Sequence, residues 1–419
     1  MSALKWYNKL QFCAIMLVVM AVAIDWHTGL WASLLLVVVS IVKAVAERRL
    51  RNPSLAKGAV WALLAIVLYV AVVSLGIVYS NDKAGASAII GRKVVLLIFP
   101  LCFLLTDTSY LDRRHFRALF FGLVATLAGL FIYNAFTNTF MVRHHAYSAL
   151  YIVTAFAYVS MVLIERWDAM KVWQRVLLAM AGVLMIVYTI YVNSRAGIIC
   201  LYGVMALLTF CLMRRVMWWK ALLIGILLAG ATYVAEKTLP GHTSRMDETF
   251  ATHTVEPGGT ETGVEAAANV DEDKEEVPSD ARYYINTIAL KTISESPLVG
   301  YGLGDYDTVL VEHYRTNGYE YGYNSRFNAH NQYTEAMLAG GVVGLAALLA
   351  MLFAPLALAL RKRRSVWPVL IFTFIVAFNL LFESMLERQM GLLFIGFLVS
   401  IMALIISSEE KKFGGVQKD

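Results

Sequence analysis

The residues with the clearest chemical meaning in this sequence are His330 and Asn331, followed after nine residues by Gly341 and Gly344. They open an apolar segment, and on a continuous helix Gly341 would lie within about 20° of the His330 face and roughly 16 Å deeper. This stripe would carry a titratable imidazole at the boundary of the segment, above two positions where a helix or lipid chain can approach closely. The amide groups and positive dipole end of the helix N-terminus would favour an anion beside His330. The plainer interpretation is a histidine that starts a helix, with glycines that serve packing.

Arg195 stands in a very short turn between two apolar segments, within the run Asn-Ser-Arg-Ala-Gly at 193–197. An arginine at membrane depth is energetically costly and usually functional. The alternative role is that of an interfacial anchor whose guanidinium reaches water along its own side chain.

Two further groups of cations flank apolar segments. Arg143, His144 and His145 precede one segment. Neighbouring side chains diverge and no third ligand is evident, so a polar wall of an acceptor or diphosphate site fits better than a metal site; interfacial anchoring is the alternative. Arg92 and Lys93 lie near the end of another segment, where they could pair with an anionic headgroup or extend to the interface.

Two acidic motifs allow other chemistry. Asp305 and Asp307 resemble the metal-binding acid pair of soluble sugar-nucleotide transferases, but they stand beside a turn and no nucleotide-binding fold accompanies them. Asp25 and His27 could form the acid/base pair of a different type of membrane transferase. We favour neither interpretation over a site at His330.

The composition indicates that membrane-spanning helices position these residues. Of 419 residues, 59% are hydrophobic and 16% are charged, against about 45–50% and about 25% in soluble domains. The positive net charge lies in short runs between apolar segments, as in membrane loops, so it does not indicate a nucleic-acid partner. A bilayer takes roughly 20 apolar residues per helix. We predict an all-α membrane protein with about twelve transmembrane helices, over residues 9–26, 29–46, 58–80, 87–105, 116–137, 146–164, 175–193, 196–213, 217–235, 332–360, 366–384 and 389–408.

Lysine and arginine residues are distributed unevenly between the two sides of these helices. With the N-terminus inside, 23 of them fall on the inner side, and only four lie in short outer connections, at Lys83, Arg143, Arg195 and Arg388. Inner loops of membrane proteins are rich in these residues. We therefore predict that both termini are cytoplasmic.

One outer connection, residues 235–331, is much longer than the others. It separates nine predicted helices, within residues 1–234, from the last three helices and a cytoplasmic tail, within residues 332–419. A connection of this length is usually either functional or disordered.

This long periplasmic loop has two parts. Residues 247–280 hold 11 acidic residues and one lysine with few apolar side chains, so we expect them to be disordered. The pattern over 281–295 predicts a short helix, and Pro297 with the glycines of 300–304 marks turns. A run rich in tyrosine follows, with Tyr314, Tyr319, Tyr321 and Tyr323.

The spacing of His330, Asn331, Gly341 and Gly344 completes a known signature: His, then Asn, Ser or Gln, then nine residues and Gly-x-x-Gly. In this the chain resembles the O-antigen ligase family, part of the wider ligase/polymerase superfamily of lipid-linked glycans. The signature stands where that family has it, at the end of the large periplasmic loop. The segment 296–302, Ser-Pro-Leu-Val-Gly-Tyr-Gly, is also similar to the family.

The resemblance covers the topology and roughly residues 190–350. It implies that an arginine in the Ser-Arg turn, here Arg195, and another early in the helical part of the loop, here Arg282, are needed for function. The planar guanidinium fork suits a pyrophosphate. For Arg282 the alternative is a surface ion pair with Asp280.

The resemblance further implies a glycosyltransferase that moves a glycan from undecaprenyl diphosphate to a lipid A–core hydroxyl, at the periplasmic face of the bacterial inner membrane. It implies a metal-independent, inverting reaction without a cofactor. His330 would take the acceptor proton as general base, while Arg195 and Arg282 would hold the diphosphate. Loop tyrosines could stack on sugars. Membrane lipids would surround the site, and its remaining lining would come from Arg92, Lys93, Arg143, His144, His145, Asn331, Gly341 and Gly344.

Three alternatives stay open. An O-antigen polymerase would use a second lipid-linked glycan as acceptor, and a protein O-oligosaccharyltransferase would use a serine or threonine. A lipid or polysaccharide transporter belongs to another class, and it should place charges at mid-membrane in broken helices. The charged candidates of this sequence gather instead at the outer boundary, which favours an enzyme.

Overall fold

The computed structural model describes residues 2–48, 50–137, 145–238 and 279–414. Over these ranges the chain forms helices and no strand. The helices are α1 (Ser2–Ile24), α2 (Trp26–Glu47), α3 (Lys57–Leu75), α4 (Lys83–Lys93), η1 (Val94–Leu97), α5 (Ile98–Leu105), α6 (Arg113–Thr137), α7 (His145–Arg166), η2 (Trp167–Ala169), α8 (Val172–Val192), α9 (Arg195–Leu212), α10 (Trp218–Thr238), α12 (Ser279–Glu295), α13 (Tyr306–Thr316), α14 (Glu320–Ser325), α15 (Gln332–Lys362), α16 (Val366–Asn379), η4 (Met385–Glu387) and α17 (Gln389–Gly414).

Among the described residues, eleven helical segments are long and apolar enough to cross a membrane, and the shorter apolar helix α16 joins them. This confirms the predicted all-α membrane class, and the protein is a multi-pass membrane protein. Two predicted spans differ in detail. The span predicted at 87–105 is divided into α4, η1 and α5, and the span predicted at 366–384 ends at Asn379. The residues that follow Asn379 form a turn rather than helix, and this turn becomes part of the candidate site.

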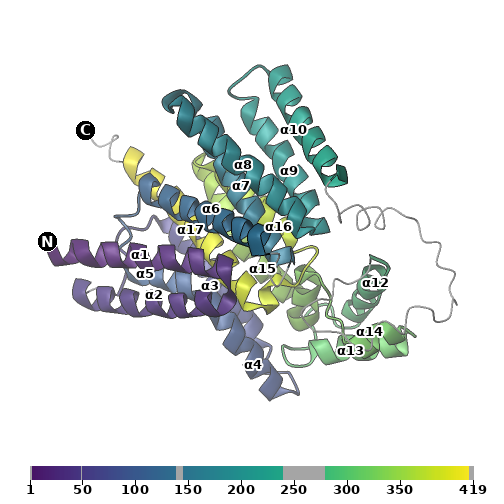
Figure 1. The fold of residues 1–419 in the computed structure, drawn as a ribbon. Coiled ribbons are helices and arrows are strands. Elements are labelled where there is room, and N and C mark those ends of the chain that lie inside the picture. Colours follow the sequence, from purple (N-terminus) through teal and green to yellow (C-terminus); the bar gives the residue numbers. More distant parts are fainter. Residues whose placement is uncertain (1, 49, 138–144, 239–278, 415–419) are drawn as a thin grey trace.

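The bundle is organised around α17, whose residues are almost all buried, whereas α10 lies at the periphery with most of its surface exposed. Helices α1 and α2 pack side by side on one side of the bundle, away from α8, α9 and α10 (Figure 1). The short helices α12, α13 and α14 form a small group of their own beside the start of α15 (Figure 1). These three helices lie within residues 235–331, the predicted periplasmic loop. Most of the segment 247–280, predicted to be disordered, lies outside the described residues.

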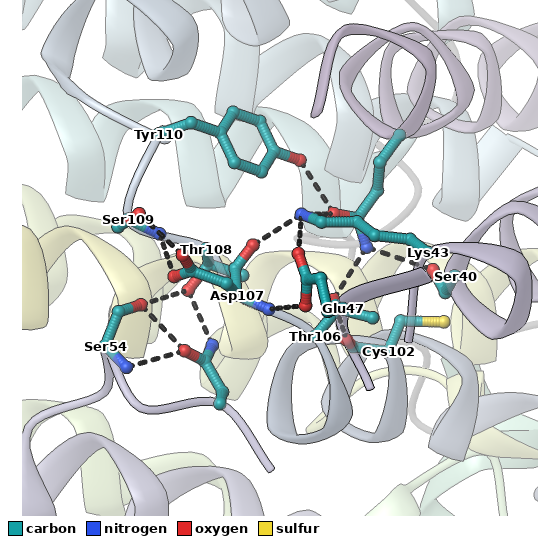
Figure 2. A network of polar contacts seen from close by, with 12 residues as sticks. Ser40, Lys43, Glu47, Ser54, Cys102, Thr106, Asp107, Thr108, Ser109 and Tyr110 are labelled. Atoms are coloured by element: carbon teal, nitrogen blue, oxygen red, sulfur yellow. Dashed lines mark hydrogen bonds and ion pairs between the residues drawn. The ribbon is translucent and has the colours of Figure 1, made fainter. Parts of the chain in front are cut away.

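A buried polar network joins α1 and α2 to the connection between α5 and α6 (Figure 2). The fully buried Lys43 ammonium donates to the Gln11 side chain at 2.8 Å and to the Asp107 carbonyl at 2.5 Å, and it lies 3.6 Å from Glu47. The Tyr110 ring covers the same ammonium at 4.4 Å. A charge removed from water must be paired to be tolerated, so this network serves to lock α1, α2 and the 106–112 connection in one arrangement.

Helix α15 breaks at Gly341, whose backbone has φ 59° and ψ −155°. The turn 297–302 docks into this break, where the interrupted helix leaves backbone groups without helical partners. Three backbone hydrogen bonds join the two segments: Tyr301 N–H to Leu338 C=O at 2.8 Å, Gly302 N–H to Ala339 C=O at 3.1 Å, and Val342 N–H to Pro297 C=O at 2.9 Å. The Gly-rich turn and the Gly-x-x-Gly motif are therefore two halves of one joint.

Both motif glycines are required by close backbone contacts in this joint. A Cβ on Gly341 would meet the Leu298 carbonyl at 2.3 Å, and one on Gly344 would meet the Ala336 carbonyl oxygen at 2.7 Å. The sequence predicted that His330 and Gly341 share one face of a continuous helix, and the structure shows that this prediction was wrong. The chain is not a continuous helix from His330 to Gly341, so the two residues do not share a straight stripe.

Candidate active site

His330 lies in the turn that leads into α15, and Asn331 caps that helix. The Asn331 side-chain oxygen accepts from the N–H groups of Tyr333 and Thr334, at 2.9 and 3.3 Å. This is the chemistry for which asparagine is preferred at a helix N-cap. The His330 backbone has φ 44°, a left-handed conformation that is uncommon outside glycine. The turn therefore holds the imidazole in a direction that ordinary helical entry would not give.

The imidazole faces an acidic partner from the turn after α16. The Oε2 of Glu383 lies 3.6 Å from the Nδ1 of His330, and the two side chains are only 20% and 15% exposed. Burial opposes ionisation of Glu383, but His330 and the positive charges of Arg282 and Arg388 together hold the pKa of this carboxyl below its usual value. Glu383 is thus a carboxylate placed among three cationic or potentially cationic groups.

Arg282 comes to this group from the first turns of α12. It is half-buried, and its Nε is shielded from solvent with no hydrogen-bond acceptor among the residues that the structure describes. A buried donor without an acceptor costs free energy. A ligand oxygen at this position would supply the missing acceptor, as expected for a diphosphate.

Hydrogen bonds to the Glu335 side chain join the turn that carries His330 to the turn that carries Glu383. Its Oε1 accepts from the N–H of Ala329 at 3.1 Å and from the hydroxyl of Ser384 at 3.0 Å. Ala329 directly precedes His330, and Ser384 directly follows Glu383. Because Glu335 is buried, this single carboxylate fixes the backbone on both sides of the imidazole–carboxylate pair.

Gln332 makes a second connection between the same segments. Its backbone N–H donates to the Leu380 carbonyl at 2.9 Å, and its side-chain oxygen accepts from Leu386 N–H at 2.6 Å. Its amide donates to Glu387 at 3.2 Å. The turn 380–388 is therefore held against the start of α15 by side chains on the first turn of that helix.

Lys93 belongs to the protein interior rather than to a lipid-facing surface. Its buried ammonium pairs with Glu387 at 2.6 Å and donates to the Leu386 carbonyl at 3.2 Å. The headgroup contact expected from the sequence is thus replaced by an internal carboxylate. Arg92 is exposed, and its charge acts on Asp307. Burial and the negative charge of Glu387 raise the pKa of Asp307 to about 6, against the opposing effect of nearby cations.

Arg195 is the first residue of α9, after the N-cap residue Ser194, whose hydroxyl accepts from Gly197 N–H at 3.3 Å. The start of α9 packs on the start of α7, because Gly197 lies against Ala149. The start of α7 also reaches the segment after the Glu383 turn, where the Tyr151 hydroxyl donates to the Met390 carbonyl at 3.1 Å. Arg195 therefore lies at the same end of the bundle as His330 and Arg282.

His145 begins α7, and its Nδ1 lies 2.5 Å from the Val192 carbonyl at the end of α8. This contact joins two helices, and the role of His145 in a polar wall stays a prediction. Arg143 and His144, expected in the same wall, lie outside the described residues.

The two other acidic motifs have structural partners. Asp305 accepts from the backbone N–H groups of Asn81 and Asp82, at 2.6 and 2.9 Å, and so fixes the turn before α4. Asp25 caps α2 by accepting from His27 N–H at 3.0 Å. Within the described ranges, no group of three or more histidines, cysteines or carboxylates is arranged to hold a metal ion.

A sequence profile of the O-antigen ligase family matches residues 180–349. These residues are similar to that family. The match runs from the middle of α8 to the middle of α15, and it includes Arg195, Arg282, His330 and both motif glycines. The recognition made from the signature is confirmed. None of the curated proteins matches the chain.

The match supports a relationship to membrane glycosyltransferases of the ligase and polymerase type over residues 180–349. Glu383 lies beyond the matched segment, as do Glu387 and Arg388. The sequence analysis missed these residues as members of the site. The available signal was the run Glu-Ser-Met-Leu-Glu-Arg at 383–388, three charged residues on the outer side between two apolar segments.

Proposed function

We propose that the protein transfers a glycan from undecaprenyl diphosphate to a hydroxyl of lipid A–core. The observation that carries this proposal is the half-buried pair of His330 and Glu383 beside Arg282, at the start of α15. An imidazole backed by a carboxylate is a general base, and a neighbouring guanidinium is a receptor for phosphate oxygens.

In the proposed reaction, the acceptor hydroxyl oxygen attacks the anomeric carbon of the first sugar on the donor. The bond between that carbon and the phosphate oxygen breaks, and undecaprenyl diphosphate leaves with the bonding electrons. His330 takes the hydroxyl proton on Nε2 and becomes an imidazolium, whose positive charge Glu383 stabilises. Direct displacement inverts the anomeric configuration. No cofactor enters this scheme, because the diphosphate is itself a stable leaving anion.

Arg282 and Arg195 hold the diphosphate in this scheme and balance the charge that grows on it as the bond breaks. The Nε–H of Arg282, which has no acceptor among the described residues, and the N-terminus of α15 both offer positive potential to the leaving group. Lysine in place of either arginine would keep the charge and lose the planar fork.

The site faces the periplasm in this proposal, and the protein lies in the bacterial inner membrane. The supporting observation is the excess of lysine and arginine in the connections on the other side. Single cysteines placed at positions 260 and 415 test the orientation. The first should react with an impermeant reagent in intact cells, and the second only after permeabilisation; the reverse result would rule the orientation out.

Reconstituted transfer tests the reaction itself. Proteoliposomes with the protein and a lipid-linked glycan receive lipid A–core, a serine- and threonine-containing peptide, or a second lipid-linked glycan as acceptor. Product on lipid A–core alone supports a ligase. Product on the second glycan or on the peptide would identify the polymerase or the protein transferase instead. Movement of the donor across the bilayer without any product would replace the enzyme by a transporter.

A further inference from the structure

A continuous series of aromatic rings leads from α12 and α14 to His330. Its first contacts are Tyr283 with Tyr284, with ring centres 5.8 Å apart, and Tyr284 stacked on Tyr319 at 5.3 Å. It continues from Tyr319 to Tyr321 at 6.4 Å and from Tyr321 to Phe327 at 5.3 Å. The last step brings Phe327 within 6.1 Å of the His330 imidazole. We call the five residues Tyr283, Tyr284, Tyr319, Tyr321 and Phe327 the aromatic track.

The track is most exposed at its start and buried where it meets His330. Tyr283 is 70% exposed, Tyr321 is 41% exposed, and Phe327 is only 5% exposed. The exposed rings belong to α12 and α14, outside the helices that are long enough to cross a membrane. Several large rings held in contact with one another at a solvent-exposed surface indicate a binding site. Their continuity with the candidate general base identifies which site they extend.

We infer that the aromatic track binds the glycan at sugars next to the reacting one. A pyranose ring presents a face of C–H groups that can cover an aromatic ring, while its hydroxyls remain available for water and the tyrosine hydroxyls. The track carries no charge, so it suits uncharged sugars better than a diphosphate. This inference rests on the function proposed above, and it assigns to these tyrosines the glycan rather than the lipid part of a substrate.

Both the donor glycan and the acceptor oligosaccharide have this chemistry. The track begins next to Arg282, the proposed diphosphate receptor, and ends at His330, the proposed acceptor base. The experiment below therefore distinguishes binding of the donor glycan from binding of the acceptor oligosaccharide. A membrane-interface role for the tyrosines is the competing explanation, because tyrosine is also enriched where lipid headgroups meet water.

Helix α14 offers a matched pair of variants. Tyr321 and Tyr323 are similarly exposed, at 41% and 38%. Residues two apart point to different faces of a helix, and Tyr323 lies against Arg315 rather than on the track. Tyr321→Ala should disturb glycan binding, whereas Tyr323→Ala should not. Tyr321→Phe keeps the ring and loses only the hydroxyl, so its effect on glycan binding should be smaller than that of Tyr321→Ala.

The experiment measures transfer by the full-length protein in proteoliposomes with donors that carry a single sugar or a long glycan. Tyr321→Ala and Tyr284→Ala should raise the KM for the long donor by about three- to tenfold and leave kcat unchanged. The KM for the single-sugar donor should stay constant. In a second arm the donor is constant and the acceptor oligosaccharide is intact or truncated; an effect confined to the intact acceptor would assign the track to the acceptor.

Two results would overturn the inference. Equal losses in Tyr321→Ala and Tyr323→Ala would show that these rings serve the fold or the membrane interface. Losses in Tyr321→Ala that are the same for every donor and acceptor length would also exclude a glycan subsite. Thermal unfolding in detergent controls for folding of each variant.

A binding measurement separates this inference from the proposed reaction. The probe is the free glycan released from the lipid-linked donor by mild acid, and binding to the solubilised protein is followed by saturation-transfer NMR. Binding that Tyr321→Ala weakens would support the track even if no acceptor gave product. Transfer without any glycan binding at these rings would leave the reaction in place and reject the track.

Discussion

The Oε2 of Glu383 lies 3.6 Å from the Nδ1 of His330, and both side chains are largely withdrawn from solvent. The two residues come from different turns, one before α15 and the other after α16. A carboxylate at this position can orient the imidazole and stabilise its charged form, so that the opposite nitrogen, Nε2, is directed to a substrate. The pair gives the signature histidine a partner that the signature does not contain.

His330→Ala should reduce transfer by about 10²–10⁴-fold, which is the usual contribution of a general base. Donor binding should persist, because the arginines that hold the diphosphate remain. The measurement is kcat with donor titration in proteoliposomes. His313→Ala is the matched control, because His313 lies in α13 and has its own carboxylate partner, Glu295, at 3.1 Å. Equal losses in the two variants would remove the special role of His330.

Glu335 should act by position rather than by contact with substrate. Glu335→Gln keeps an acceptor oxygen for Ala329 N–H and the Ser384 hydroxyl, and we expect kcat to stay within a few-fold. Glu335→Leu leaves both donors unpaired, at a cost of about 1–3 kcal/mol for each buried group. Its kcat should fall while the KM for the donor is unchanged. A lower yield of folded protein with normal kcat per molecule would show a purely structural role.

Asp307 should make stability depend on pH. Its pKa is about 6 in the folded protein and about 3.9 in an unfolded chain. The folded state therefore holds the proton more tightly. The resulting stabilisation is complete below about pH 3.9 and is lost as the pH rises through about 6. Asp307→Asn should remove this decline, which amounts to roughly 3 kcal/mol at most.

The comparison is the difference in thermal unfolding between wild type and Asp307→Asn from pH 3 to pH 7. Asp112→Asn serves as a control of opposite sign. Burial of Asp112 is slight, and its hydrogen bonds with His115 and Arg114 keep its pKa low, so the stability that it contributes is lost as the pH falls. A wild-type curve parallel to that of Asp307→Asn would contradict the assignment.

Gly341→Ala should destabilise the joint between α15 and the turn 297–302. The φ of 59° is unfavourable for alanine, and its Cβ would lie 2.3 Å from the Leu298 carbonyl. We expect a loss of at least about 1–3 kcal/mol of stability, measured by thermal unfolding in detergent. Gly340→Ala is the neighbouring control, because a Cβ there would meet no atom within 4 Å. Similar stability for both variants would show that the joint tolerates a side chain.

The sequence alone determined the helical membrane class, and it marked His330, Arg195 and Arg282 as candidates for the site. These features depend on local information, because apolar runs define spans and a short signature marks a turn entering a helix. Asn331 was predicted to line the site, and the structure adds that it caps α15, a role that also depends on local information. Asparagine is preferred at a helix N-cap because its side chain bonds to neighbouring backbone N–H groups, and this does not depend on distant parts of the chain.

Only the tertiary structure decided what surrounds those residues. Lys93 and Glu387 are 294 positions apart in the chain, and Glu335 and Ser384 are 49 apart. No local pattern encodes such pairs, because they depend on how whole helices pack. The break at Gly341 has the same origin. A regular 3.6-residue repeat predicts a straight helix, and the docked turn 297–302 supplies the hydrogen bonds that make the interruption stable.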